Sequence, residues 1–243
     1  MTDPKKNIVF VLGQNFFSIY LIKKIISSNL NKNLNVIIFY SEKKNKLKNI
    51  LYNLILLNPI NIIEIFYLYL KYFLKKILVI DVNSNKFINF VNRKKTFLVI
   101  SLMSDQIFKK KTIEKIKCDL VNFHPGLIPK YCGLYPNFYS ILNNEKYFGI
   151  TFHKIDKKID HGQVLKIKKF KNKLLNNSIY QIAKKLYFND KTTKFIVECI
   201  TNYKELKKKT RKKNSLYKKK IVNSFPSIRD IIKYKFNFFI KHI

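Results

Sequence analysis

The chain has 243 residues, of which 47% are hydrophobic, so its length and composition fit one globular domain with a sizeable core plus an appendage. Its 49 Lys and Arg residues against 14 Asp and Glu residues give a formal net charge of +35, which predicts anionic partners such as tRNA, a nucleotide-linked substrate or an acidic membrane face. The three cysteines are odd in number and lack a C-x-x-C spacing, which argues against a disulfide framework and against a zinc site.

The high charge has a second explanation in the composition. Lys, Asn, Ile, Phe and Tyr are abundant together, and Trp is absent, as A/T-rich codons would produce. We favour this explanation, because net charge governs solubility and steering and does not set a reaction class. The cysteine usage suits a reducing compartment, and no small-residue cleavage site follows the first apolar run. We therefore expect a cytoplasmic protein without a signal peptide.

The first elements predict the opening of an α/β sheet. Residues 8–12 form an apolar run rich in β-branched side chains, Gly13 follows, and residues 16–26 are amphipathic. This order predicts a buried strand, a tight turn and a helix, with a second strand at residues 34–40. Because no G-x-G-x-x-G motif is present, no dinucleotide site is predicted.

Residues 50–73 form a strongly apolar stretch that is interrupted by Pro59, Glu64 and Lys71. A helix that spans a membrane needs about 20 nearly uninterrupted apolar residues. We therefore expect two packed helices here rather than one membrane span. A peripheral membrane contact through the Tyr, Phe and Lys side chains of this stretch stays open as an alternative.

Strands and helices continue to alternate after this stretch. The pattern predicts strands at residues 77–80, 97–102 and 120–124, with helices at 85–91 and 109–117 between them. Strands that are apolar throughout and alternate with helices favour a Rossmann-like α/β fold, in which a mostly parallel sheet is flanked by helices. Ligands of such folds bind at the carboxyl ends of the strands, which here are residues 103–108 and 122–124.

The second half of the chain completes the predicted domain. It reads as helices at residues 135–142, 178–188 and 192–203, and as strands at 149–154 and 163–170. Residues 207–213 are basic and lack apolar periodicity, so we interpret them as a solvated linker or arm. An aromatic-rich helix after Phe225 is expected to dock back on the domain. We accordingly predict a catalytic domain at residues 1–205 and a basic linker with a short helical tail at 206–243.

One block concentrates the residues that shape loops and carry chemistry. Four of the five glycines and three of the four histidines fall between Asn122 and Gly162. Gly permits backbone angles that other residues resist, and loops rich in His, Asn and Asp are common sites of chemistry. We therefore interpret this block as the active site.

The side chains of the block suit the transfer of a small acyl group. Asn122 and His124 are two residues apart on an extended segment, so both project from one face. Together an amide and an imidazole can bind a carbonyl oxygen and handle a proton. Asp160 could fix the His124 tautomer. We prefer it to Asp156, because only Asp160 is followed by x-Gly, and we find no convincing nucleophile and no metal site.

At these residues the chain resembles a known family. The segment Asn122-Phe123-His124-Pro125-Gly126-Leu127-Ile128-Pro129-Lys130-Tyr131, the strand that contains His153, and Asp160-His161-Gly162 are similar in order and spacing to the signature of the formyltransferases that use 10-formyltetrahydrofolate. That family includes glycinamide ribonucleotide, methionyl-tRNA and amino-sugar formyltransferases. The likeness in architecture extends over about residues 7–203.

The resemblance implies roles for the three central residues. Asn122 would bind the formyl oxygen, His124 would stabilise the developing charge and assist proton transfer, and Asp160 would hold His124 and help to protonate the departing folate nitrogen. The co-substrate would be 10-formyltetrahydrofolate. The loops expected to bind its pterin supply the candidate residues Ser104, Asp105, Gln106, Ile107, Ile155 and Asp156.

Several residues depart from the family pattern and concern the acceptor. Gly126 stands where many members have Ser, and Cys132 replaces a common Arg. His153 reads as a structural residue of its strand or, less favoured, as one that faces the acceptor.

The acceptor is expected to be a small primary amine that bears phosphate, and a nucleotide-linked amino sugar is our preferred class. Methionyl-tRNA is the alternative, which makes tRNA a possible partner, and DNA is not expected. A hypothesis of another class is a non-catalytic, basic RNA- or membrane-binding protein on a formyltransferase scaffold.

Overall fold

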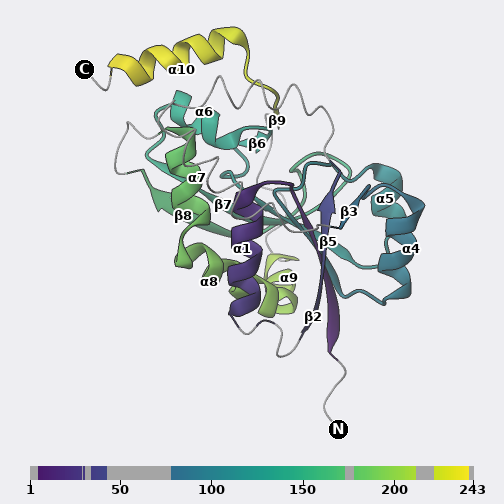
Figure 1. The fold of residues 1–243 in the computed structure, drawn as a ribbon. Coiled ribbons are helices and arrows are strands. Elements are labelled where there is room, and N and C mark those ends of the chain that lie inside the picture. The colour runs from purple at the N-terminus through teal and green to yellow at the C-terminus, as the bar shows by residue number, and fades with distance from the viewer. Residues whose placement is uncertain are drawn as a thin grey trace.

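A seven-stranded sheet with the order β3-β2-β1-β4-β5-β7-β8 forms the centre of the molecule (Figure 1). The computed structural model describes residues 5–28, 30, 34–42, 78–172, 178–211 and 222–240. The strands of the sheet are β1 (Lys6–Leu12), β2 (Leu34–Ser41), β3 (Val79–Ile80), β4 (Leu98–Leu102), β5 (Asp119–His124), β7 (Tyr147–Lys154) and β8 (Val164–Lys171). The first five pair in parallel, whereas β7 and β8 are antiparallel. The predicted α/β fold with a mostly parallel sheet is confirmed.

Each central strand feeds two hydrophobic cores, one on either face of the sheet. Ile8, Phe10 and Leu12 of β1 pack into one core, and Val9 and Val11 pack into the other. All five side chains are fully buried. Since successive side chains of a strand alternate between faces, an uninterrupted apolar run requires cover on both sides.

Helices provide this cover. They are α1 (Phe16–Ser27), α4 (Asn85–Arg93), α5 (Lys110–Lys115), α6 (Pro136–Leu142), α7 (Ile179–Tyr187), α8 (Asp190–Thr201), α9 (Tyr203–Arg211) and α10 (Ile228–Ile240). α1 and α8 lie together on one side of the sheet, and α4 and α5 lie on the other (Figure 1). The Ser178 hydroxyl and the Gln181 side chain form a capping box that fixes the start of α7.

The C-terminal segment returns to the domain. The two-residue strand β9 (Val222–Asn223) pairs with β6 (Cys132–Gly133), and α10 packs on α6. Tyr234 of α10 is almost completely buried, and its ring lies 5.4 Å from that of Phe138. The expected docking of the terminal helix is therefore observed.

The basic run at residues 207–213 was expected to be a solvated linker, but as far as Arg211 it is helical. These residues continue the helix α9, and the ammonium group of Lys207 pairs with the carboxylate of Asp119. Straight-chain Lys residues have good helix propensity, so a charged run can prolong a helix after its apolar face ends. Residues 212 and 213 and the whole stretch 50–73 lie outside the described residues. Of the helices that are described, none is long and apolar enough to cross a membrane.

Candidate active site

Asn122 and His124 lie at the carboxyl end of β5, where the parallel part of the sheet meets the antiparallel part. The backbone register places Asn122 directly opposite His153 of β7. The side-chain nitrogen Nδ2 of Asn122 is 3.3 Å from Nε2 of His153. His124, two residues further along β5, projects from the same face and is 3% exposed.

Asp160 reaches these residues from the loop that follows β7. Its oxygen Oδ2 is 3.4 Å from Nδ1 of His124, and its oxygen Oδ1 is 3.4 Å from Nε2 of His153. The backbone N–H of Gly133 donates a hydrogen bond of 2.7 Å to the same carboxylate. The structure thus brings together Asn122, His124 and Asp160, the three residues that the sequence singled out.

His153, which was expected to be a structural residue of its strand, belongs to the same cluster. Its side chain is 1% exposed and contacts both Asn122 and Asp160. This placement follows from the antiparallel pairing of β7 with β5, whose register sets which residues face each other. That register cannot be read from the sequence spacing alone, since a loop and a helix separate the two strands.

By contrast, Asp156 is exposed, and its carboxylate accepts a hydrogen bond from the backbone N–H of Lys158 in its own loop. The preference for Asp160 over Asp156 therefore agrees with the geometry. Asp160 also has a φ of +52°, a left-handed conformation that Asp tolerates better than most residues. This turn directs the carboxylate toward the two imidazoles.

Backbone carbonyls fix the tautomer of each imidazole. Nε2 of His124 is 2.6 Å from the carbonyl oxygen of Tyr131, and Nδ1 of His153 is 2.7 Å from that of Lys154. Because a carbonyl can only accept, each of these nitrogens carries the hydrogen of the neutral ring. The remaining nitrogen of each ring faces Asp160, at 3.4 Å in both cases.

This arrangement has room for one further proton. A proton on Nδ1 of His124 or on Nε2 of His153 would lie between that nitrogen and the Asp160 carboxylate. Burial lowers the pKa of His124, and the neighbouring His153 acts in the same direction, while the Asp160 charge and the Tyr131 carbonyl oppose them. The ring is therefore neutral at rest and can accept a proton during a reaction.

The Asp160 carboxylate stays ionised in this setting. Burial raises the pKa of its carboxyl group, but the hydrogen bond with His153 and the charges of His124 and His153 outweigh this effect. With the Gly133 N–H they hold the pKa at about 2. A buried carboxylate of negative charge thus faces both imidazole rings.

The loop between β5 and α6 holds His124 from the other side. The Tyr131 hydroxyl donates a 2.7 Å hydrogen bond to Glu145, and Asn143 donates to that hydroxyl. Since the Tyr131 carbonyl binds His124, these bonds anchor the loop that orients the ring. A Cβ on Gly126 would lie 2.6 Å from both His124 Nε2 and the Tyr131 oxygen, so the Ser common at this position in the family would not fit this loop as it stands.

The C-terminal segment supports the site through Gly133. The Leu134 N–H donates to the carbonyl of Asn223 in β9, and a Cβ on Gly133 would lie 2.3 Å from that oxygen. Gly133 also has a φ of +85°, which side chains disfavour. Sequence reasoning missed this contact because the segments are ninety residues apart.

Cys132, which takes the place of an Arg, is fully buried beside Asp160, with its thiol 3.6 Å from that residue's carbonyl oxygen.

The loop after β4, expected to bind the pterin, uses its polar side chains to hold the scaffold. Asp105 Oδ2 accepts a hydrogen bond of 2.6 Å from the backbone of Gln14. Gln106 Oε1 accepts one of 2.8 Å from the backbone of Val82, and Ser104 Oγ bonds the backbone of Gln106. The side chains of these candidates therefore bond to the protein backbone, so a ligand at this loop would contact the backbone groups of the loop.

The same loop lies near the second loop that was expected to bind the pterin. Ile107 is 58% exposed, which is unusual for a large apolar side chain. Ile155, at the start of the second loop, packs against the same cluster as Phe108, and Lys157 of that loop pairs with Glu114 of α5. The two candidate loops therefore lie beside each other, and each carries an apolar side chain.

Comparison with known proteins agrees with this geometry. The family model for formyl transferases matches residues 81–200. A dTDP-4-amino-4,6-dideoxyglucose formyltransferase of Mycobacterium bovis is 38% identical over 68 residues, which is 28% of either chain. A methionyl-tRNA formyltransferase of Finegoldia magna is 27% identical over 99 residues, which is 41% of this chain and 31% of the relative.

Solved structures extend the likeness in fold. A sugar N-formyltransferase from a Shewanella species superposes with a TM-score of 0.63 at 20% identity, covering 93% of this chain and 86% of the other. A phosphoribosylglycinamide formyltransferase from Campylobacter jejuni gives a TM-score of 0.54 at 14% identity, covering 82% and 97%. The curated relatives are matched over about a third of their length or less. Residues 81–200 of the chain, which include the Asn-x-His and Asp-x-Gly elements, therefore belong to the formyl transferase family.

Proposed function

We propose that this protein transfers a formyl group from 10-formyltetrahydrofolate to a primary amine, and that the acceptor is a nucleotide-linked amino sugar. The observation that carries the proposal is the contact of Asp160 with both His124 and His153, beside the amide of Asn122. This cluster provides a hydrogen-bond donor for a carbonyl oxygen and an empty position for one proton. Those are the two requirements of direct acyl transfer to an amine.

Each residue has a distinct part in this chemistry. When bound, 10-formyltetrahydrofolate supplies the formyl carbon and the leaving nitrogen. The Asn122 amide donates to the formyl oxygen and stabilises the negative charge that it gains. His124 takes a proton at Nδ1 as the amine attacks, and the ionised Asp160 stabilises the imidazolium that forms. The proton can then be passed on to the leaving nitrogen.

His153 positions the amide of Asn122. In its neutral tautomer Nε2 accepts from Asn122 Nδ2, while the other ring nitrogen donates to the Lys154 carbonyl. The amide is therefore held from behind and needs little reorganisation when it binds a developing charge. We place the folate between the backbone of residues 103–107 and the loop that contains Ile155.

The acceptor class is supported by similarity and by charge. One solved structure of similar fold is a sugar N-formyltransferase, and another, an N-formyltransferase from Helicobacter canadensis, was crystallised with folinic acid and dTDP-3-aminofucose. A net charge of +35 suits a phosphate-bearing acceptor. Methionyl-tRNA is the second candidate, because two methionyl-tRNA formyltransferases match this chain at 27% identity over 99 residues and at 36% identity over 87 residues.

The test is the consumption of 10-formyltetrahydrofolate by the purified protein with one acceptor at a time. Nucleotide-linked amino sugars, methionyl-tRNA and glycinamide ribonucleotide are compared, with His124→Ala as the control. Turnover with an amino sugar that the variant loses supports the proposal. Turnover only with methionyl-tRNA replaces the acceptor, and failure of the folded protein to bind the folate favours a non-catalytic scaffold.

A further inference from the structure

The helix α10 has two unlike faces. Tyr234 and Ile231 pack on the domain at α6. Ile228, Ile232 and Phe236 are instead 77%, 63% and 63% exposed, although they belong to the same helix. The helix lies on the outside of the molecule, beyond α6 as seen from the sheet, so one of its faces is turned away from the domain (Figure 1).

The three exposed apolar side chains form one stripe. Ile228, Ile232 and Phe236 are spaced four residues apart, and residues with this spacing are neighbours on one face of a helix. Single exposed apolar side chains are common on protein surfaces, whereas a continuous apolar stripe marks a site of interaction. Because α10 already buries its other face on α6, the stripe is a second apolar face of a docked helix.

Local hydrogen bonds fix the start of this helix. The Asp230 carboxylate accepts from the backbone N–H of Ser227 at 3.0 Å and from its hydroxyl at 2.7 Å, and the backbone N–H of Asp230 donates to that hydroxyl. This reciprocal arrangement is a capping box. Asp230 is the one acidic residue in the sequence of α10, and its carboxylate is engaged in the first turn.

Basic side chains border the stripe. Arg229 and Lys233 each follow a stripe residue by one position, and both are exposed. They are also four residues apart, so they lie together along one edge of the stripe. Helices that lie in a membrane interface have this pattern, because the apolar face enters the lipid while the cations meet the phosphates of the headgroups.

Length and charge decide which partner the stripe fits. The 13 residues of α10 make a helix about 20 Å long, whereas the hydrocarbon core of a bilayer is about 30 Å thick. The helix is therefore long enough to lie on a membrane but too short to cross it. A second copy of the chain would bring another net charge of +35 toward Arg229 and Lys233. An anionic bilayer complements this charge, and a second copy opposes it.

We propose that α10 docks this protein on a membrane that contains anionic lipid. Ile228, Ile232 and Phe236 enter the boundary between the headgroups and the acyl chains, and Arg229 and Lys233 pair with lipid phosphates. The domain stays in water, since it is attached to the opposite face of α10. This docking does not rest on formyl transfer, and each can fail without the other.

The test measures co-sedimentation of the full chain with vesicles of phosphatidylcholine alone and with vesicles that also contain phosphatidylglycerol. The stripe variant is Ile228→Gln/Ile232→Gln/Phe236→Gln, which keeps a good helix former at each position and leaves the buried Tyr234 in place. Circular dichroism and thermal unfolding confirm that the variant is folded.

The stripe variant should bind anionic vesicles about 100-fold or more weakly than wild type, because each large apolar side chain that enters an apolar phase contributes about tenfold. Arg229→Gln/Lys233→Gln should bind them about 25-fold more weakly, since each cation near an anionic surface contributes about fivefold. Binding to phosphatidylcholine alone should not depend on these two charges. Equal binding of anionic vesicles by wild type and the stripe variant would overturn the proposal.

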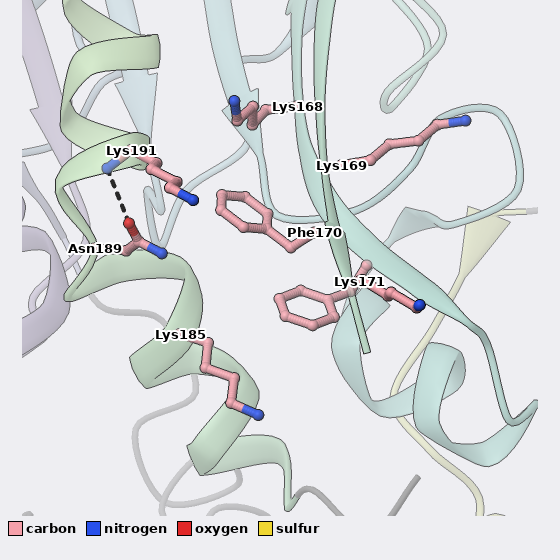
Figure 2. A pocket seen from close by; sticks show the side chains of 8 residues that line it. Lys168, Lys169, Phe170, Lys171, Lys185, Asn189 and Lys191 are labelled. Atoms are coloured by element: carbon pink, nitrogen blue, oxygen red, sulfur yellow. Dashed lines mark hydrogen bonds between the residues drawn. The ribbon is translucent and has the colours of Figure 1, made fainter. Parts of the chain in front are cut away.

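A control matched in charge separates α10 from the general charge of the chain. Lys168 of β8 and Lys191 of α8 line a hollow to which no described residue of α10 contributes (Figure 2). Lys168→Gln/Lys191→Gln removes the same two charges but leaves the border of the stripe intact, so it should bind anionic vesicles nearly as well as wild type. A loss as large as that of Arg229→Gln/Lys233→Gln would show that net charge alone attracts the chain to the membrane, which would overturn the role of α10.

A Trp probe reports on insertion directly, because the chain contains no Trp of its own. The emission of Phe236→Trp should shift to shorter wavelength with anionic vesicles. The emission of Tyr147→Trp, which replaces an exposed side chain of β7, should not shift. An unshifted spectrum of Phe236→Trp would contradict insertion of the stripe.

Analytical ultracentrifugation without lipid tests the rival partner, a second copy of the chain. The stripe variant and wild type should sediment alike if the stripe is kept for lipid. A wild-type dimer that the stripe variant abolishes would assign the stripe to self-association and overturn the proposal.

Discussion

The charge on Asp160 should stabilise the folded protein as well as serve the reaction. The carboxyl group has a pKa of about 2 in the fold against an ordinary value of 3.8. A difference of nearly 2 pKa units corresponds to about 2 kcal/mol of folding free energy at neutral pH. Replacing the charge in Asp160→Asn should therefore reduce the free energy of unfolding by about 2 kcal/mol at pH 7.

The pH dependence gives this prediction its sign. Because the pKa is lower in the folded state, the stabilisation is complete above the unfolded pKa and is lost as the pH falls toward 2. By pH 3 the Asp160 contribution should have fallen to roughly half of its value at pH 7. Urea unfolding of wild type and Asp160→Asn at several pH values between 7 and 3 measures the difference directly.

Asp156→Asn is the matched control, because this carboxylate lies in the same loop but is exposed and bonded only within that loop among the contacts described. Its free energy of unfolding should change by less than about 0.5 kcal/mol at any of these pH values. If Asp160→Asn were as stable as wild type at pH 7, or if its deficit did not shrink toward pH 3, the account of the Asp160 environment would be wrong.

Three further substitutions test the loop that orients His124. Gly126→Ala places a Cβ 2.6 Å from His124 Nε2. Turnover should therefore fall about 100-fold, and the free energy of unfolding should fall by about 1–3 kcal/mol. Turnover equal to that of wild type would refute the tight fit. Tyr131→Phe removes the hydroxyl that anchors the loop and should lower kcat several-fold while the KM for the folate is unchanged. In Gly133→Ala the new Cβ would lie 2.3 Å from the Asn223 carbonyl oxygen, so β9 should detach from β6. Limited proteolysis would then cleave the C-terminal segment faster than in wild type. An unchanged cleavage rate would count against this contact.

Much of the fold follows from local patterns of the sequence. Fully apolar runs such as residues 8–12 and 98–102 predicted central strands, because only a strand covered on both faces buries every side chain. The Asn-x-His spacing predicted that Asn122 and His124 share a face, since side chains of a strand alternate. These features depend on residues that are close in the sequence.

The features that sequence reasoning missed depend on contacts between distant segments. The place of His153 depends on the β5–β7 register, and the support of Gly133 depends on a strand ninety residues later. Asp105 and Gln106 were expected among the residues that bind the folate, and the structure adds that their side chains bond backbone groups at neighbouring strand ends. Their residue types suit either role, so only the packing of the strands decides between them.

The measurement that tests the central claim most directly is the detection of a formylated amine by mass spectrometry. Wild-type protein, His124→Ala and the surface control Lys86→Gln are each incubated with 10-formyltetrahydrofolate and a nucleotide-linked amino sugar. We predict formylated sugar with wild type and with Lys86→Gln, and a yield at least 100-fold lower with His124→Ala. Equal yields from His124→Ala and wild type would contradict the assignment of the active site.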